Sequence, residues 1–302
     1  MPEAGFPLET VSMRGLDRDA VWKNIALPVL LPRALFRGIG IVDRFRPDVA
    51  LGVGGYAMAP AVAAARVRQV PYVLHEQNVR PGLATRLFAG GAAAVCATFP
   101  GTEARLRRTR RVVLTGLPLR EGFEPAKPRV PPRRLLVTGG SQGARRLNRA
   151  TWEALDGLLE RFEEVVHVTG QQGAEELERY RRPGYSPLTF TTEMPSLMRE
   201  ADLVVSRAGV GTLAELTAVG LPAILVPGTF GGGHQEENAE ALVQAGAAVR
   251  IPDDELTGRR LLDEIAGLDD AHLSAMAAAA RSLGRRDAAE QVLRILEEVA
   301  RV

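Results

Sequence analysis

The chain has 302 residues, of which 46% are hydrophobic and 25% charged, and its formal net charge is +2. This composition excludes a disordered chain and predicts a globular protein large enough for two domains. The basic residues are almost all arginine, which suits phosphate contact but which we interpret as base composition, and we expect no nucleic-acid partner. The single cysteine, Cys96, favours a reducing cytoplasm.

The first forty residues contain neither a signal peptide nor a membrane span by our interpretation. Residues 1–12 carry two glutamates, and the apolar stretch 25–41 is interrupted by prolines, glycines and two arginines. The leucines, Phe36 and arginines between Leu30 and Arg37 suit either a helix lying on a lipid surface or a helix that packs on the first domain. The sequence alone leaves both open.

From residue 47 onward, short β-branched runs alternate with helical stretches, which predicts a parallel α/β sheet with crossover helices. The expected strands of this half are 49–53, 72–75, 95–97 and 112–115, and the expected helices are 59–68 and 83–89. Five prolines between 118 and 133 then interrupt the pattern and indicate a linker. We therefore expect a first domain over 1–118, a linker over 119–133 and a second domain over 134–302.

The second half repeats the same rhythm, which predicts a second doubly wound sheet with a helical tail from Ala271 to the end. Its expected helix is 145–161, and its expected strands are 134–138, 164–169, 188–191, 203–206, 223–226 and 248–251. Parallel sheets of this kind bind ligands at the carboxyl ends of their strands, so the loops that follow the strands are the places to look for a site.

A glycine-rich turn over 137–144 leaves the first of these strands and enters a helix. Backbone amides at a helix N-terminus attract anions, and glycine lets a diphosphate approach closely, so Ser141 is a candidate ligand of a phosphate. A tight turn in which Ser141 only caps the helix explains this segment equally well.

Two further segments make the site more specific. In 206–215, a glycine pair and Thr212 can meet phosphate, while Glu215, about one helical turn further on, can accept both hydroxyls of a ribose. In 231–239, Gln235 and Asn238 lie three residues apart, and paired amides suit sugar hydroxyls, although a solvated helix start is the plainer interpretation. Because all three segments follow strands at one end of the sheet, we expect them to converge.

These segments, together with Gly52 to Tyr56 and His75 to Asn78, resemble the MurG family of peptidoglycan N-acetylglucosaminyltransferases in the GT-B superfamily, from about Met1 to the C-terminus. The resemblance implies two Rossmann-like lobes with a cleft between them. It also implies inverting transfer of N-acetylglucosamine from UDP-N-acetylglucosamine to undecaprenyl-pyrophosphoryl-N-acetylmuramyl-pentapeptide (lipid I), giving lipid II, with no cofactor or metal. A peripheral location at the cytoplasmic side of the cell membrane follows from the lipid-linked acceptor.

Residue by residue, the resemblance assigns roles to two groups of positions. The donor-binding positions are Asn78, Arg120, Ser141, Thr191, Val210, Gly211, Thr212, Leu213, Ala214, Glu215, Gln235 and Asn238. The acceptor-binding positions are Gly54, Gly55, Tyr56, His75 and Glu76, of which His75 and Glu76 are also weak candidates for the catalytic base.

The family pattern begins with a strand and a Gly-Gly-Thr-Gly-Gly-His turn, and neither is found in this sequence. In the family, that turn carries acceptor phosphate contacts and the histidine usually considered as the base. The first lobe is therefore expected to be incomplete, either because the start is placed too far downstream or because the chain begins there and binds a UDP-sugar without turnover. A GT-B-type sugar-nucleotide 2-epimerase is a further alternative, since it shares the donor lobe.

Overall fold

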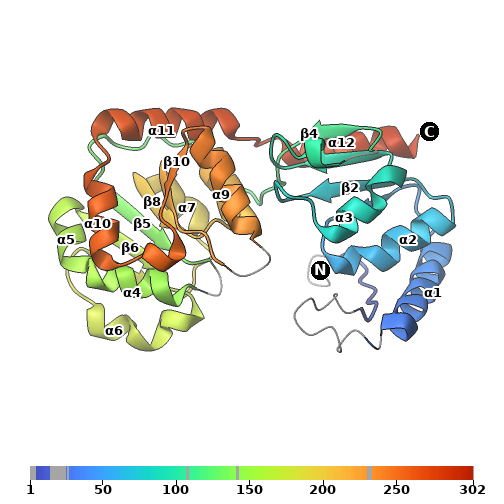
Figure 1. The fold of residues 1–302 in the computed structure, drawn as a ribbon, viewed down its shortest axis with the longest axis horizontal. Coiled ribbons are helices and arrows are strands. Elements are labelled where there is room, and N and C mark those ends of the chain that lie inside the picture. The colour runs from blue at the N-terminus through green and yellow to red at the C-terminus, as the bar shows by residue number, and fades with distance from the viewer. Residues whose placement is uncertain are drawn as a thin grey trace. The chain divides into compact units, whose positions relative to one another are not determined.

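The computed structural model describes residues 5–13, 25, 27–106, 109–140, 143–229 and 233–301. It divides into two compact units, one formed by 1–116 with 287–302 and the other by 117–286 (Figure 1). Each unit contains one parallel sheet, so the expected architecture of two α/β units is confirmed. The expected boundary is corrected at the C-terminus, because the last helix belongs to the first unit and not to the second.

The first unit contains a four-stranded parallel sheet in the order β1-β2-β3-β4. Apolar residues of α2 and α3 cover one face, whereas Val292, Ile295 and Val299 of α12 pack on Val73 and Cys96 of the other. This packing explains the correction at the C-terminus, because without α12 one face of the sheet would lie open. The elements of the unit are α1 (Leu27–Phe45), β1 (Ala50–Gly52), α2 (Ala59–Val67), β2 (Tyr72–Glu76), α3 (Leu83–Phe88), β3 (Ala94–Ala97), β4 (Val112–Leu114) and α12 (Ala288–Ala300).

Helix α1 has one narrow packed face and one exposed apolar face. Ala34 is buried, and Gly38 approaches α2 so closely that an added Cβ would lie 2.8 Å from the carbonyl oxygen of Pro60. Val29 and Phe36, by contrast, are 61% and 73% exposed. The helix therefore packs on the first unit along one stripe and also presents an unpartnered apolar stripe, so it combines features of both sequence hypotheses.

The second unit contains a six-stranded parallel sheet in the order β10-β9-β8-β5-β6-β7. Alternate residues of the strands pack on α4, α5 and α10, and the residues between them are also buried, as expected for a sheet covered on both faces. The elements are β5 (Arg134–Thr138), α4 (Arg145–Glu153), α5 (Leu155–Arg161), β6 (Glu164–Val168), α6 (Leu177–Tyr180), β7 (Tyr185–Leu188), α7 (Met194–Glu200), β8 (Leu203–Ser206), α8 (Val210–Val219), β9 (Ala223–Leu225), α9 (His234–Gln244), β10 (Ala248–Arg250), α10 (Gly258–Ala266) and α11 (Asp270–Leu283).

Three expected boundaries are wrong in detail. The strand expected over 188–191 is β7 and ends at Leu188, because its alternating residues Tyr185 and Pro187 are the buried ones. The helix expected over 145–161 is divided at Ala154 into α4 and α5, and the expected tail helix is divided into α11 and α12.

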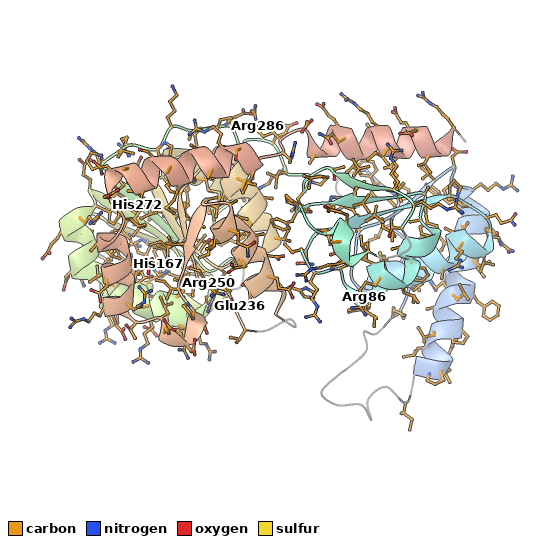
Figure 2. All side chains as sticks on the ribbon, turned by 45° about the horizontal axis from the view of Figure 1, so that its top comes forward. Arg86, His167, Glu236, Arg250, His272 and Arg286 are labelled. Carbon is orange, nitrogen blue, oxygen red and sulfur yellow. The ribbon has the colours of Figure 1, made fainter. Side chains whose placement is uncertain are left out.

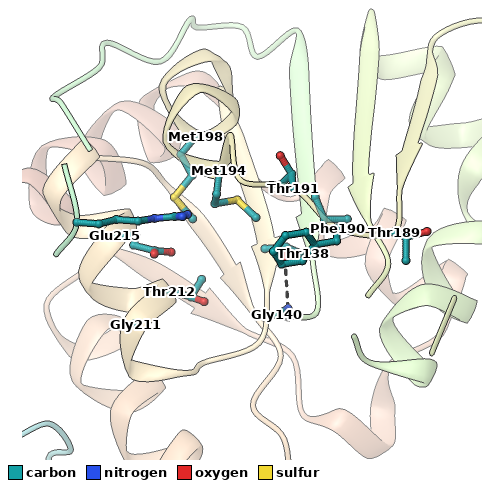
Figure 3. A pocket seen from close by; sticks show the side chains of 12 residues that line it. Thr138, Gly140, Thr189, Phe190, Thr191, Met194, Met198, Gly211, Thr212 and Glu215 are labelled. Atoms are coloured by element: carbon teal, nitrogen blue, oxygen red, sulfur yellow. Dashed lines mark hydrogen bonds between the residues drawn. The ribbon is translucent and has the colours of Figure 1, made fainter. Parts of the chain in front are cut away.

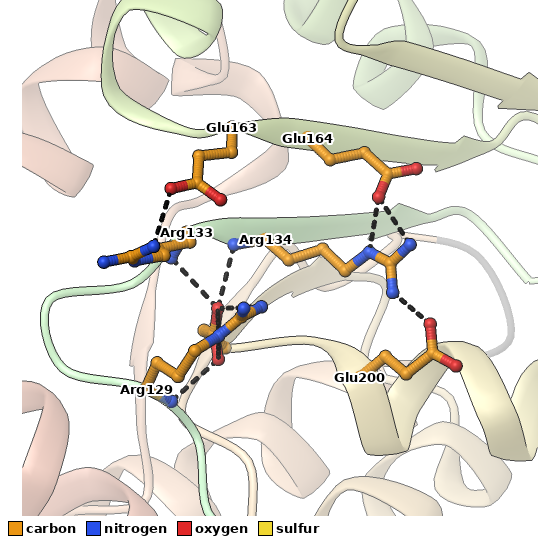
Figure 4. A network of polar contacts seen from close by, with 7 residues as sticks. Arg129, Arg133, Arg134, Glu163, Glu164 and Glu200 are labelled. Atoms are coloured by element: carbon orange, nitrogen blue, oxygen red, sulfur yellow. Dashed lines mark hydrogen bonds and ion pairs between the residues drawn. The ribbon is translucent and has the colours of Figure 1, made fainter.

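Asp202 anchors the segment before β5 to the sheet, and its partners Arg129, Arg133 and Arg134 are labelled in Figure 4. Its buried carboxylate accepts hydrogen bonds from the backbone amides of Arg129 at 2.7 Å and of Arg133 and Arg134 at 2.9 Å each, and from the Arg129 guanidinium at 3.1 Å. Burial alone would raise the pKa of Asp202, but these donors together lower it. Glu164 and Glu200 pair with the Arg134 guanidinium, which fixes the beginning of β5 further.

Candidate functional site

A pocket of about 250 Å³ opens at the carboxyl ends of the central strands of the second unit (Figure 3). The chain order reverses between β5 and β8, so the pocket lies at the switch point where doubly wound sheets bind ligands. Strand register brings the loops together, because Thr138, the last residue of β5, pairs with both Val168 of β6 and Ser206 of β8. The lining residues are Arg120, Thr138, Gly140, Val168, Thr189, Phe190, Thr191, Met194, Met198, Gly211, Thr212 and Glu215.

The glycine-rich turn after β5 requires glycine at the described positions. A Cβ on Gly139 would lie 2.5 Å from the amide of Ala144, and one on Gly143 would lie 2.1 Å from the carbonyl oxygen of Thr169. Gly140 lines the pocket, and its amide donates to the Thr138 hydroxyl at 3.2 Å. The turn therefore keeps bare backbone beside the pocket, as a diphosphate site needs. Ser141, the candidate phosphate ligand, lies outside the described residues.

The N-terminus of α8 forms another side of the pocket. Gly209 caps the helix with an extended backbone, and Gly211 and Thr212 in its first turn line the pocket, followed one turn later by Glu215. Of the remaining positions expected here, Val210 and Ala214 are half-buried, whereas Leu213 is fully buried in the core. The side chain of Leu213 therefore supports the helix from below and does not line the pocket, which corrects its expected position.

Glu215 is the electrostatically unusual group of the pocket. Burial raises the pKa of its carboxyl to about 7, although the positive charge of Arg120 opposes this rise. Within the described parts of the chain, the Glu215 carboxylate has no partner other than this charge, and its oxygens face a pocket. Such a carboxylate can accept hydrogen bonds from two neighbouring hydroxyls of a ligand, which would then stabilise its charged form.

The loop between β7 and α7 supplies pocket residues that the sequence reasoning missed. Phe190 is 63% exposed although it lines the pocket, and Thr191 beside it, an expected donor-binding position, lines the pocket too. Figure 3 shows Phe190 and Thr191 across the pocket from Thr212 and Glu215. The signal that the sequence offered for Phe190 was an aromatic residue near the carboxyl end of an expected strand. Thr138, Val168, Thr189, Met194 and Met198 also line the pocket and were not singled out.

Helix α9 carries the two amide side chains that were expected to contact a sugar. The Gln235 side-chain oxygen accepts a hydrogen bond from the amide of Gly228 at 2.8 Å, which closes the loop from β9 to α9, and Glu236 ties the same helix start to Arg250 at 2.6 Å (Figure 2). Asn238 is only 1% exposed. The two amides therefore do not share an open face as expected, and Asn238 is a buried supporting residue in this structure.

Arg207 ties together loops on the same edge of the sheet and was not singled out from the sequence. It is 8% exposed, and its guanidinium donates to the carbonyl oxygen of Val226 at 3.1 Å and pairs with Asp253 at 2.5 Å. Asp253 in turn lies 3.6 Å from the guanidinium of Arg146 on α4. The loops after β8, β9 and β10 are thereby joined to α4, the helix that follows the glycine-rich turn.

In the first unit, the two candidate catalytic side chains are buried at the end of β2. The Nε2 atom of His75 lies 2.9 Å from the carbonyl oxygen of Gly116, and burial lowers the pKa of this histidine. The Glu76 carboxylate accepts hydrogen bonds from the amides of Asn78 and Gly82 at 3.0 Å each. Both side chains therefore hold loops, and among the described residues their hydrogen bonds are those of supporting groups.

The loop after β1 holds the remaining acceptor candidates. Gly54 and Gly55 both have positive φ, and a Cβ on Gly54 would lie 2.5 Å from the side-chain oxygen of Gln77. Tyr56 follows with 54% of its surface exposed. Within the described ranges, no three His, Cys, Asp or Glu side chains form a group able to hold a metal ion.

Comparisons with known proteins identify relatives of both units. The model of the glycosyltransferase family 28 C-terminal domain matches residues 134–292, and that of the family 28 N-terminal domain matches 1–97. The UDP-N-acetylglucosamine--N-acetylmuramyl-(pentapeptide) pyrophosphoryl-undecaprenol N-acetylglucosamine transferase of Syntrophotalea carbinolica is 40% identical over 312 residues, which cover 99% of this chain and 86% of that protein.

Among solved structures, the MurG crystal structure from Acinetobacter baumannii has a TM-score of 0.82 and 28% identity, covering 98% of this chain and 86% of that one. A UDP-GlcNAc 2-epimerase from Neisseria meningitidis has a TM-score of 0.63 and 15% identity, covering 91% of this chain and 83% of that one. At this identity, the second likeness concerns the fold alone.

Proposed function

Because the chain belongs to glycosyltransferase family 28, and within it to the MurG family of UDP-N-acetylglucosamine-dependent transferases, we propose that it transfers N-acetylglucosamine from UDP-N-acetylglucosamine to lipid I. The acceptor atom is the C4 hydroxyl of the N-acetylmuramyl group, and the product is lipid II. The observation that carries the proposal is the pocket at the strand switch point, where a glycine turn, a helix N-terminus and Glu215 meet.

The pocket has a suitable group for each part of UDP. The Glu215 carboxylate would accept both ribose hydroxyls, and the exposed ring of Phe190 offers the uracil a surface for stacking. The amides of the glycine-rich turn and the first turn of α8 would hold the diphosphate, with Ser141 and Thr212 as side-chain donors. Arg120 would add a positive charge beside it.

The reaction needs the UDP leaving group to be stabilised as the bond between the anomeric carbon and the phosphate oxygen breaks. Negative charge then grows on the diphosphate, so amide donors and Arg120 would act most strongly in the transition state. Gln235, held at the start of α9, would orient the sugar. The C4 hydroxyl attacks from the opposite face, which inverts the configuration, and its proton passes to a general base.

On the acceptor side, the loop of Gly54, Gly55 and Tyr56 would contact lipid I. Gly55 has positive φ, and no described atom would lie within 4 Å of a Cβ at this position, so the loop can approach a phosphate or sugar closely there. His75 and Glu76 would act by holding the neighbouring loops, and Asn78, two residues after β2, stays a proposed donor-binding residue.

We also propose that the protein works at the cytoplasmic side of the cell membrane as a peripheral protein. Among the described residues, no helix has the length and apolar character of a membrane span. Helix α1 instead exposes Val29, Leu31 and Phe36 next to Arg33 and Arg37. Apolar side chains flanked by cations suit the boundary of an anionic bilayer, where a lipid-linked acceptor would be found. Phe36→Glu should weaken cosedimentation with anionic vesicles, whereas Leu293→Glu on α12 should not.

The direct test is transfer of labelled sugar from UDP-N-acetylglucosamine to a lipid I analogue. We expect a disaccharide product from the wild-type chain, and a donor KM raised about 10- to 100-fold by Glu215→Ala, which removes two charged hydrogen bonds to the ribose. Glu160→Ala, which changes an exposed glutamate on α5, is the matched control. UDP binding without product, or formation of the 2-epimer in the absence of acceptor, would contradict the proposal.

A further inference from the structure

A network of hydrogen-bonded polar side chains is buried near the glycine-rich turn of the second unit. The indole Nε1 of Trp152 is 2.9 Å from the Tyr185 hydroxyl, which is 2.9 Å from Nδ1 of His167. Nε2 of His167 is 3.1 Å from the side-chain oxygen of Asn148, whose Nδ2 donates to the carbonyl oxygen of Thr169 at 2.9 Å. All five residues are between 0 and 9% exposed, and Figure 2 places His167 inside the unit.

The two end members of this network, Trp152 and the Thr169 carbonyl, determine the direction of every hydrogen bond in it. The Trp152 indole can only donate, so the Tyr185 oxygen accepts, and its single proton is free for Nδ1 of His167. The other end is a carbonyl oxygen, which can only accept, so Asn148 turns its NH2 group toward Thr169 and its oxygen toward His167. His167 must then carry its proton on Nε2.

The protonation state of His167 agrees with this direction. Burial lowers the pKa of His167 to about 3, so the ring is neutral at physiological pH. A second proton on Nδ1 would point at a hydroxyl that already accepts from Trp152, and would leave the Tyr185 proton without its acceptor. The network therefore has one arrangement of protons, and His167 fixes which way the Asn148 amide faces.

Asn148 connects this network to the glycine-rich turn. Its backbone amide donates to the carbonyl oxygen of Ala144 at 2.9 Å, while its side chain holds the carbonyl oxygen of Thr169. That same carbonyl oxygen is where a Cβ on Gly143 would clash, at 2.1 Å. One residue thus clamps the end of the glycine-rich turn and the loop after β6, and these two segments meet in close contact.

We propose that Asn148 is a positioning residue for the donor diphosphate and that His167, in its neutral Nε2-protonated form, sets the orientation of Asn148. This inference rests on the proposed function, because the diphosphate belongs to the UDP-sugar placed over the turn. If the amide of Asn148 turned round, its oxygen would face the Thr169 oxygen, and the repulsion would separate the loop after β6 from Gly143. The pocket floor between Gly140 and Val168 would widen as a result.

Substitutions that differ only in hydrogen-bonding polarity test the inference. His167→Leu removes the donor to Asn148, and Asn148→Leu removes the clamp itself, so each should weaken UDP binding about 10- to 100-fold, the range expected for displaced ligand groups. His167→Gln keeps an acceptor toward Tyr185 and a donor toward Asn148, and should restore affinity to within about threefold of wild type. Ile265→Ala, a cavity in the same core on α10, controls for lost stability alone.

UDP affinity is measured by calorimetry on full-length protein at a temperature where circular dichroism shows each variant folded, and nitrogen-detected NMR of the wild type reports the His167 tautomer. Wild-type affinity in folded Asn148→Leu, no difference between His167→Leu and His167→Gln, or a proton on Nδ1 would each overturn the inference. Failure of the wild type to bind UDP would instead contradict the proposed function. The tautomer measurement uses the unsubstituted chain, so it tests the inference even where a variant does not fold.

Discussion

Replacing Glu215 by glutamine should stabilise the second unit at neutral and higher pH. Glutamine resembles the protonated carboxyl in shape, but it cannot ionise in a buried position. In the folded chain the pKa of Glu215 is about 7, against 4.5 for the ordinary group. At about 1.4 kcal/mol for each pKa unit, the difference of about 2.5 units makes the cost of holding the ionised side chain in the pocket about 3 kcal/mol or slightly more.

The sign of the pH dependence follows from proton binding. Between pH 4.5 and 7 the folded state keeps a proton on Glu215 that the unfolded state has lost, so the stability due to this group falls as pH rises through that window. Wild type and Glu215→Gln should therefore be equally stable below about pH 4.5, and above pH 7 the variant should be more stable by up to about 3 kcal/mol.

Urea unfolding between pH 4 and 8 measures this difference. The sequence has two tryptophans, and Trp152 lies in the same unit as Glu215. Replacing the other one, Trp22→Phe, therefore restricts the tryptophan fluorescence signal to that unit. The same variant should bind UDP more weakly, since activity and stability make opposite demands on this position. A stability difference that does not change with pH, or a variant less stable than wild type at pH 8, would refute the reasoning.

Three further outcomes are expected. Affinity for UDP should rise from pH 5.5 to 8, with protons released near pH 6.5, because ribose hydroxyls favour the ionised form of Glu215; calorimetry in two buffers of different ionisation enthalpy measures the release, and zero release would contradict it. Gly143→Ala should abolish UDP binding, since its Cβ meets the Thr169 oxygen at 2.1 Å, whereas Gly246→Ala, also at positive φ but in open space, should not. Asp202→Asn should lower the free energy of unfolding by about 3 kcal/mol at pH 7, because it leaves backbone donors of the Arg129 segment poorly paired. The difference in stability between wild type and variant, measured by urea unfolding, should narrow as pH falls through the lowered pKa of Asp202.

The alternation of strands and helices could be predicted from the sequence because it depends on local patterns. Apolar runs such as Leu203 to Ser206 end in glycine turns, and parallel strands of this kind read as continuous buried segments. The glycine-rich turn and Glu215 were likewise recognisable, because their spacing after a strand limits what they can reach.

The features that were missed depend on contacts between distant segments. The assignment of α12 to the first unit depends on Val73 and Cys96, which are about two hundred positions earlier in the sequence. Burial of Leu213 and Asn238 depends on tertiary packing. The family resemblance proposed Leu213 and the amide chemistry proposed Asn238, but the side chains of both are buried in the structure. Phe190 needed the end of β7 to be placed correctly, and that boundary was three residues off.

The return of the last helix to the first sheet has a consequence for biosynthesis. The second unit, 117–286, is complete before α12 has been translated, whereas the first unit lacks one wall of its core until α12 has left the ribosome. Domains usually mature in the order in which they are synthesised. Here the order should be reversed: the second unit can fold first on a ribosome-bound chain, and the unit formed mostly by the first 116 residues closes only after α12 has emerged.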